Sequence, residues 1–272
     1  LLKDAISKTY GKKGQDTVLM NQKAVDQAVK GLQKVEYPQH WKTIADDKET
    51  AEKERPDFIR NVADVMERRK GDTLPVSAFT PGGIFPMSTT KYEKRGTATQ
   101  LPKWVSENCI QCNVCAFVCP HAAIRPSLMT DAEVNNCPHK DTLKTLKPFG
   151  KGLEGYHFSI QVSPCDCTGC NNCVAACPAI KGKALEMHPA EELRENENKL
   201  WDYYASLPVH TGNMDKYTVK GSQFQKPLLE FSGACAGCGE TPYLKLLTQL
   251  FGSRLLIANA TGCSSIWGGS AP

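Results

Sequence analysis

Apolar residues recur at helical spacing in several stretches of the chain. Residues 1–35 contain two such stretches, and residues 58–66 contain a shorter one. Residues 190–205 repeat the pattern, and a further helix opens at Pro242 with its apolar side chains on one side as far as Phe251. Because an α-helix turns once about every 3.6 residues, this spacing predicts amphipathic helices in all of these stretches.

Other stretches have different textures. The apolar run Leu255 to Ala258 is typical of a buried parallel strand, and the turn after it would lie where open α/β sheets place their ligands. Residues 43–56 are highly charged and are predicted to form a surface linker. Residues 72–103 are rich in proline and glycine, which predicts an extended segment that wraps a neighbouring part of the molecule.

The composition narrows the class of protein. The chain has 33 Lys and Arg against 29 Asp and Glu, which argues against a basic nucleic-acid binder. No apolar run approaches the roughly 18 residues of a membrane span, and no signal peptide is present, so we expect a cytoplasmic protein with reduced thiols. The chain does not begin with Met and ends directly after a motif, so we expect it to be a segment of a longer polypeptide.

Cysteine is the unusual residue, with 13 among 272 residues. The run from Cys109 to Pro120 recurs from Cys167 to Pro178 with an offset of 58, and each run reads C-x2-C-x2-C-x3-C-P. In two-cluster ferredoxins the last cysteine of each such run ligates the other cluster. We therefore predict two [4Fe–4S] clusters, one held by Cys109, Cys112, Cys115 and Cys177 and the other by Cys167, Cys170, Cys173 and Cys119.

Zinc and disulfides are the alternatives for these cysteines. Two identical four-cysteine runs with terminal prolines fit a zinc site poorly, and disulfides are not expected without a secretory context. Cys137 and Cys165 lie outside the repeat and are predicted to be spare thiols. We expect His121 and His139 to be packing or surface residues and not metal ligands.

A second group of cysteines follows the repeat. Cys235 and Cys238 form a C-x2-C pair, and Cys263 comes after the predicted strand. The three residues are one ligand short of a cubane cluster. From spacing alone, a third cluster and a zinc or redox C-x2-C pair are equally supported.

At this point the chain resembles a known family over essentially its whole length. Tyr92–Gly96, Cys109–Pro126 and Cys235–Tyr243 are similar to three signatures of the pyruvate:ferredoxin oxidoreductases in which all domains are fused in one chain. The resemblance implies an α+β fold, in which a two-cluster ferredoxin-like domain is flanked by a small linking domain, named for its Glu-Lys-Arg (EKR) signature, and by the start of an α/β thiamine-diphosphate-binding domain. The implied order is the end of an upstream α/β domain with its linker (1–50), the linking domain (51–103), the ferredoxin-like domain (104–208) and the start of the thiamine domain (209–272).

The resemblance also implies a third [4Fe–4S] cluster near the thiamine. Cys235, Cys238 and Cys263 match three of its ligands, and the fourth would lie beyond Pro272. Glu240 and Cys263 match positions that approach thiamine diphosphate. The Mg²⁺ ligands and the residues that contact pyruvate are expected outside this segment.

The implied activity is oxidative decarboxylation of pyruvate to acetyl-CoA and CO₂. Electrons would pass through three clusters to ferredoxin or flavodoxin, with coenzyme A as a substrate, in a homodimer whose remaining domains belong to the same chain. A related 2-oxoacid oxidoreductase, a stand-alone iron–sulfur electron carrier and a zinc-binding interaction protein are the alternative interpretations.

Overall fold

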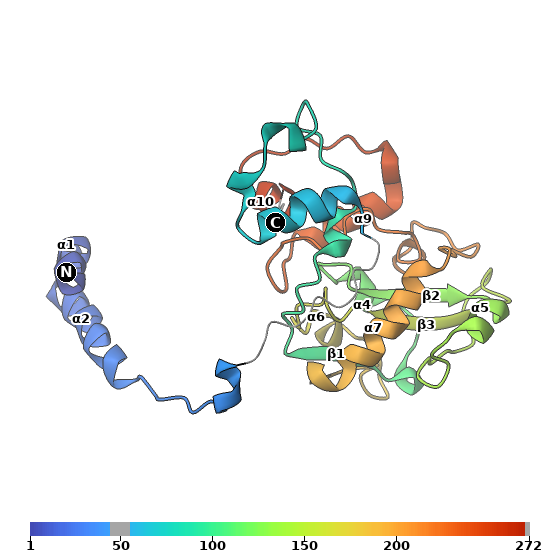
Figure 1. Cartoon of the computed structure of the whole chain (residues 1–272). Coiled ribbons are helices and arrows are strands. Elements are labelled where there is room, and N and C mark those ends of the chain that lie inside the picture. The colour runs from blue at the N-terminus through green and yellow to red at the C-terminus, as the bar shows by residue number, and fades with distance from the viewer. Residues whose placement is uncertain (44–54, 270–272) are drawn as a thin grey trace. The chain divides into compact units, whose positions relative to one another are not determined.

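The computed structural model describes residues 1–43 and 55–269, and the chain divides into two compact units, Leu1–Glu54 and Arg55–Pro272 (Figure 1). The first unit contains α1 (Leu2–Tyr10), the 3₁₀ turn η1 (Gly11–Lys13), α2 (Gln15–Lys30) and η2 (Gln39–Lys42). The two helices expected in residues 1–35 are therefore confirmed. They pair antiparallel, because Lys3 reaches Asp26 while Gln22 donates to the Ser7 hydroxyl at 3.0 Å. Most of the predicted linker 43–56 lies outside the described residues.

Two antiparallel two-stranded sheets organise the second unit. Strand β1 (Gln100–Trp104) pairs with β4 (Leu185–Pro189), and β2 (Ile124–Met129) pairs with β3 (His157–Val162). A cysteine run and a short helix lie between β1 and β2, and the second run and helix lie between β3 and β4. Each half of the repeat thus pairs its strands with the other half, which brings the two cysteine runs together.

The two cysteine runs also share their backbone conformation. Helix α4 (Val114–Phe117) follows Asn113 and helix α6 (Asn172–Ala175) follows Asn171, and both asparagines have positive φ, 61° and 66°. A second equivalent pair, Gln111 at 57° and Gly169 at 68°, is also left-handed. The repeat seen in the sequence is therefore a repeat of local structure.

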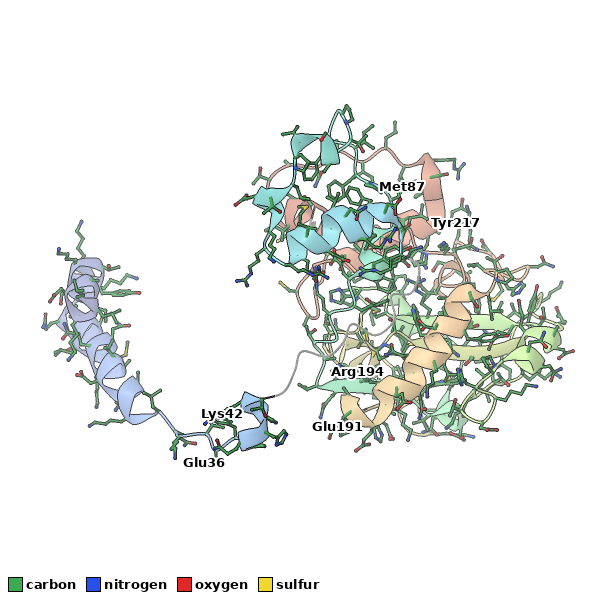
Figure 2. All side chains as sticks on the ribbon, viewed as in Figure 1. Glu36, Lys42, Met87, Glu191, Arg194 and Tyr217 are labelled. Carbon is green, nitrogen blue, oxygen red and sulfur yellow. The ribbon has the colours of Figure 1, made fainter. Side chains whose placement is uncertain are left out.

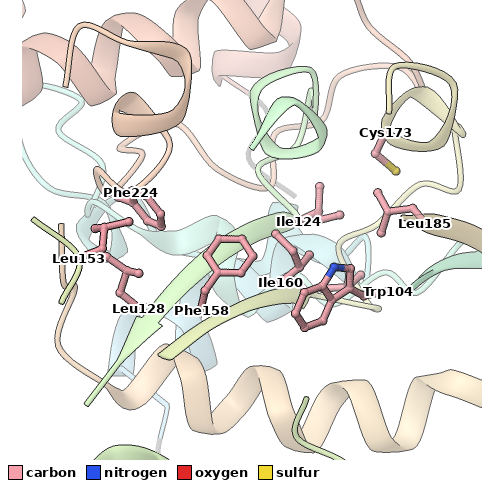
Figure 3. Close-up of a cluster of buried hydrophobic side chains, with 10 residues drawn as sticks. Trp104, Ile124, Leu128, Leu153, Phe158, Ile160, Cys173, Leu185 and Phe224 are labelled. Carbon is pink, nitrogen blue, oxygen red and sulfur yellow. The ribbon is translucent and has the colours of Figure 1, made fainter. Parts of the chain in front are cut away.

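The largest apolar cluster lies against the two sheets and joins segments far apart in the chain (Figure 3). Phe158 on β3 is fully buried, and its ring meets Trp104 of β1 edge-on at 6.1 Å and Phe224 at 6.4 Å. Cys173 belongs to the same cluster. The hydrophobic core and the cysteine sites are therefore built from the same packing.

Helices cover the ferredoxin-like part as expected. The predicted helix 190–205 is α7 (Ala190–Ser206), and Leu200 and Trp201 on it are buried. The shorter α5 (Asp131–Asn136) begins with a capping box in which Thr130 and Glu133 satisfy each other's backbone N–H. His210 adds a contact to the Glu133 carboxylate at 2.8 Å, which attaches the chain after α7 to this helix.

The segment before β1 is built from short turns. The predicted helix 58–66 is confirmed as a π-helical turn, η3 (Ile59–Ala63), followed by α3 (Asp64–Glu67). Three 3₁₀ turns then carry the chain to β1: η4 (Gly71–Thr73), η5 (Val76–Ala78) and η6 (Thr89–Tyr92). The segment is therefore a series of short turns and not extended, while its hydrogen bonds to Cys165 and Glu230 agree with the expected wrapping.

The last part of the chain differs from expectation. It contains α8 (Val219–Ser222), α9 (Thr241–Phe251), η8 (Gly252–Arg254) and α10 (Cys263–Gly269), and no described residue pairs with the run 255–258 as a strand. The predicted parallel strand is therefore wrong, since Leu256 is fully exposed and Ile257 is 74% exposed. A strand requires a neighbouring strand for its backbone hydrogen bonds, and an apolar run alone does not supply one.

The mixed helix and strand architecture is confirmed, but the described residues after 209 show no α/β sheet. The helix predicted to begin at Pro242 is present as α9, but the face that it buries differs from the expected apolar one. Its buried side chains are Thr241, Lys245, Thr248 and Gln249, whereas the apolar Tyr243 is largely exposed. Within residues 1–43 and 55–269, no helix is long and apolar enough to span a membrane.

Candidate iron–sulfur site

The first predicted cysteine group surrounds a cavity. Its walls include Cys109, Cys112, Cys115 and Cys177, together with apolar residues such as Trp104 and Leu185. Three of the thiols come from the first run and the fourth comes from the second. The structure therefore groups these side chains in the crossed arrangement that the repeat predicts.

The second group surrounds a similar cavity. Its cysteines are Cys119, Cys167, Cys170 and Cys173. The cavities are neighbours, because helices α4 and α6 pack against each other and Cys173 of the second group is close enough to Cys115 of the first to raise its pKa. Two redox centres held here would lie close together.

Backbone N–H groups point at two of the sulfur atoms. The N–H of Gly169 donates to Cys167 Sγ at 3.5 Å, and the N–H of Ala184 donates to Cys177 Sγ at 3.4 Å. Burial raises the pKa of the Cys109 thiol, and the backbone N–H of Gln111 opposes the rise. These donors favour negatively charged sulfur within an otherwise apolar wall.

Burial is the dominant influence on these thiols. It raises the pKa of Cys167 and of Cys173 to about 12, and neighbouring cysteines add to the rise. Thiolates in such a place require compensating positive charge, which iron supplies in a cluster. Among the described residues, no three Cys, His, Asp or Glu side chains converge tightly enough for a single metal ion. The two cavities and their four-thiol donor sets fit [4Fe–4S] clusters.

Helix α9 supports the loop that carries Cys115 and Cys119. Lys245 is 2% exposed, and its Nζ donates to the carbonyls of Ala116, of Phe117 at 3.2 Å and of Cys119 at 3.1 Å. One turn earlier, the Thr241 hydroxyl donates to the Pro120 carbonyl at 2.8 Å. Sequence analysis missed this role, because both residues lie on the polar side of a helix whose apolar side suggested the buried face.

The EKR stretch, Tyr92–Gly96, holds the chain next to the second cysteine run. Lys94 forms an ion pair with Asp166, whose side chain is almost fully buried directly before Cys167, and the Ser163 hydroxyl donates to the same carboxylate. The N–H of Gly96 donates to the Cys165 carbonyl at 2.9 Å. The Glu-Lys-Arg signature is recognisable in the sequence. Nothing in the sequence indicates that its lysine, Lys94, pairs with Asp166.

The third group of cysteines is not brought together by any cavity or contact of the described residues. Cys235 and Cys263 are exposed and Cys238 is partly buried. Burial would raise the pKa of Cys238, but the backbone N–H groups of Thr241 and Glu240 outweigh it and lower that pKa. The link to Cys263 is indirect: Trp267 Nε1 on α10 donates to Glu240 Oε2 at 3.2 Å.

The remaining candidates lie in different surroundings. His121 is buried, with Nδ1 3.2 Å from the Ser232 carbonyl, but it also lines the second cavity, and its Nε2 has no hydrogen-bond partner among the described residues. Cys165 exchanges a weak contact with the Asn198 amide, and Cys137 is buried away from both cavities.

Two protein families match parts of the chain. A family described as "EKR: Domain of unknown function" matches residues 45–98, and the 4Fe-4S binding domain matches residues 102–125. The second match covers the first cysteine run, the end of β1 and the start of β2. The predicted EKR-type and ferredoxin-like parts are thereby confirmed.

Curated relatives match the chain from end to end. It is 56% identical over 271 residues to the pyruvate:ferredoxin oxidoreductase of Moorella thermoacetica and 52% identical over 273 residues to the pyruvate-flavodoxin oxidoreductase of Enterobacter agglomerans. It is also 46% identical over 300 residues to the pyruvate dehydrogenase [NADP(+)] of Cryptosporidium parvum. All of this chain is covered in each case, but it spans only 23%, 23% and 15% of those relatives' lengths. The chain therefore corresponds, over its whole length, to a segment of the pyruvate:ferredoxin and pyruvate-flavodoxin oxidoreductase family.

Proposed function

We propose that the protein carrying this chain oxidises pyruvate to acetyl-CoA and CO₂ and passes the electrons through [4Fe–4S] clusters to ferredoxin or flavodoxin. The observation that carries the proposal is the pair of adjacent four-cysteine cavities in a chain whose relatives are named for this reaction. Each relative quoted above is named for pyruvate, whereas the acceptor in the names changes. Pyruvate is therefore better supported than the acceptor.

The eight cysteines of the repeat are the proposed ligands of two clusters. Cys109, Cys112, Cys115 and Cys177 hold one, and Cys119, Cys167, Cys170 and Cys173 hold the other. When bound, such clusters supply one-electron transfer at low potential. The chain's own part is to hold the thiolates, to direct N–H groups at the sulfur atoms and to exclude water with Trp104 and its apolar neighbours.

We assign a third cluster to Cys235, Cys238 and Cys263, with a fourth ligand outside this segment. The lowered pKa of Cys238 at the start of α9 favours the thiolate that a cluster requires. Glu240 and Cys263 are the proposed contacts with thiamine diphosphate, and the contact between Trp267 and Glu240 ties their two helices together. The Mg²⁺ ligands, the pyruvate site and the coenzyme A site belong to other domains of a cytoplasmic homodimer.

Metal analysis of the anaerobically purified protein tests this assignment. We expect about twelve iron and twelve sulfide per full chain if all three clusters are present, and about eight of each if only the repeat is loaded. Zinc in place of iron would contradict the proposal.

Single substitutions separate the sites. Cys170→Ser should remove the EPR signal of one paired cluster and abolish pyruvate-dependent ferredoxin reduction, whereas Cys165→Ser, a thiol lost five residues earlier, should do neither. Cys238→Ala should lower iron by about four per chain while the paired clusters stay loaded. Pyruvate-dependent reduction at the full rate in Cys238→Ala would rule out the third cluster's role.

A further inference from the structure

We propose that Lys245 is a positioning residue whose buried charge raises the reduction potential of the paired clusters, above all that of the cluster held by Cys119. The inference rests on the cluster ligation proposed above. It concerns a residue that lies outside both cysteine runs, on a helix the sequence assigns to the next domain. The argument has three parts: the internal symmetry, the burial, and the charges that surround the ammonium group.

The internal repeat provides a built-in comparison. In its second half, Lys183 Nζ donates to the carbonyls of Ala175 at 3.2 Å and of Cys177 at 2.7 Å. Phe117 and Cys119 are the equivalent residues of the first half, at the offset of 58, and their carbonyls accept from Lys245. In both halves, therefore, a lysine from outside the short helix donates to carbonyls at the end of that helix, which the helix itself leaves without donors.

The two lysines differ in origin and surroundings. Lys183 follows its own cysteine run by six residues and is exposed to solvent. Lys245 comes from α9, 126 residues beyond Cys119, and is almost fully buried. Water and salt screen the charge of an exposed lysine, whereas a buried charge acts at much lower effective dielectric.

The negative groups that act on Lys245 are the cluster ligands themselves. Burial lowers the pKa of Lys245 to about 8, which leaves its ammonium charged at neutral pH; the thiolates of Cys119 and Cys115 favour that charge and the cation Arg125 opposes it. Reduction adds one negative charge to a cluster. A buried ammonium beside its ligands stabilises the reduced form more than the oxidised form and so raises the potential.

The helix that carries Lys245 also fixes its position. Thr241 donates to the Pro120 carbonyl, and Cys238 lies directly before the same helix. One rigid element thus holds the loop of Cys119 and presents the C-x2-C pair of the proposed third cluster. Thr241 supplies the same kind of hydrogen bond without a charge, so it provides the matched control.

The test is an EPR-monitored redox titration of the anaerobically purified full-length protein, with iron counted in every variant. Lys245→Met and Lys245→Gln should shift the potential of the Cys119 cluster to more negative values. Lys245→Arg, Thr241→Val and Lys183→Met should stay close to wild type. Unchanged potentials in Lys245→Met or Lys245→Gln at full iron content would overturn the proposal.

Loss of iron is also informative. If both neutral variants lose the Cys119 cluster, Lys245 is needed to hold the cluster and not to set its potential, and the proposal fails. If Lys245→Arg loses it as well, the charge is not the property that matters and the proposal fails. A wild-type protein without iron would instead refute the cluster ligation on which the inference rests.

Discussion

At the scale of single residues, equivalent left-handed positions are filled differently in the two cysteine runs. Gln111 adopts φ 57° and uses its amide to bind the next loop, donating to the Lys147 carbonyl at 2.9 Å and accepting from the Phe149 N–H at 2.7 Å. Gly169 adopts φ 68° against β1, where a Cβ atom would lie 3.0 Å from the Gln100 carbonyl oxygen. The second run therefore needs glycine for space as well as for conformation.

We expect Gly169→Ala to destabilise the protein by about 2–4 kcal/mol and to loosen the Cys167 cluster. The matched control is Gly155→Ala, because Gly155 has φ 82° with nothing within 4 Å of its Cβ position. It should cost only the left-handed strain, about 1 kcal/mol. Denaturant unfolding and iron retention provide the comparison, and equal losses in the two variants would show that the contact with β1 is unimportant.

Glu197 on α7 should make stability depend on pH. Burial raises its pKa to about 7, and Lys103 opposes the rise only weakly. The folded state thus binds a proton that the unfolded state has released, so stability should fall as the pH rises from about 4.5 to about 7. Glu197→Gln should flatten this slope in thermal unfolding followed across pH. Glu195→Gln, which changes an exposed neighbour paired with Lys199, should retain it.

At the scale of elements, periodicity located the helices better than it located their contacts. Helix α7 is predicted as amphipathic, and its apolar residues Leu200 and Trp201 are buried. Helix α9 was predicted with its apolar residues on one side, but its polar side, with Thr241 and Lys245, packs on the cysteine loop. The amphipathic pattern shows only that a helix has an apolar and a polar face. In α9 the polar face is the buried one, because its side chains donate to backbone carbonyls of another segment.

The EKR stretch binds the residues directly before the second cysteine run. Lys94 pairs with Asp166, and its ammonium lies 4.6 Å from the Phe231 ring centroid. Burial raises the pKa of Asp166, and Lys94 and Ser163 oppose the rise. Arg194 of α7 holds the same stretch by donating to the carbonyls of Gly96 and Ala98, each at 3.0 Å.

Lys94→Met should therefore leave a buried carboxyl group without its cation and lower the free energy of unfolding by about 1–3 kcal/mol. Lys91→Met, an exposed lysine three residues earlier, should cost about 0.5 kcal/mol or less. Calorimetry of the two variants checks the difference. If both changes were equally mild, the EKR lysine would have no structural role at Asp166.

At the scale of the whole molecule, the crossed strand pairing and the shared core make the second unit cooperative. Trp104, Phe158 and Phe224 come from three separate segments and meet in one cluster, and Trp104 also lines the first cysteine cavity (Figure 3). Figure 2 shows the side chains of this unit, with Glu191 and Arg194 of α7 labelled. A substitution that destabilises the core should consequently also disturb the cysteine sites.

Phe158→Ala should lower the free energy of unfolding by about 3–5 kcal/mol and release iron in the same transition. Phe149→Ala removes the same atoms from a ring that is 61% exposed and should have little effect on either. Absorbance of the clusters and circular dichroism, followed together during heating, measure both. Separate transitions in Phe158→Ala would contradict a common core.

The sequence predicted iron–sulfur chemistry, because the spacing within each cysteine run is a local pattern and the repeat has a constant offset of 58. The crossed grouping of the eight cysteines was predicted from the rule for two-cluster ferredoxins. Local signals also located the helices. Only the tertiary structure decided which distant groups meet. Lys245 reaches the loop of Cys119 and Lys94 reaches Asp166 through contacts 126 and 72 residues apart. The run 255–258 has no strand partner among the described residues. Such contacts depend on how the carbonyls, charges and strand edges of other segments are satisfied, and no local pattern encodes that.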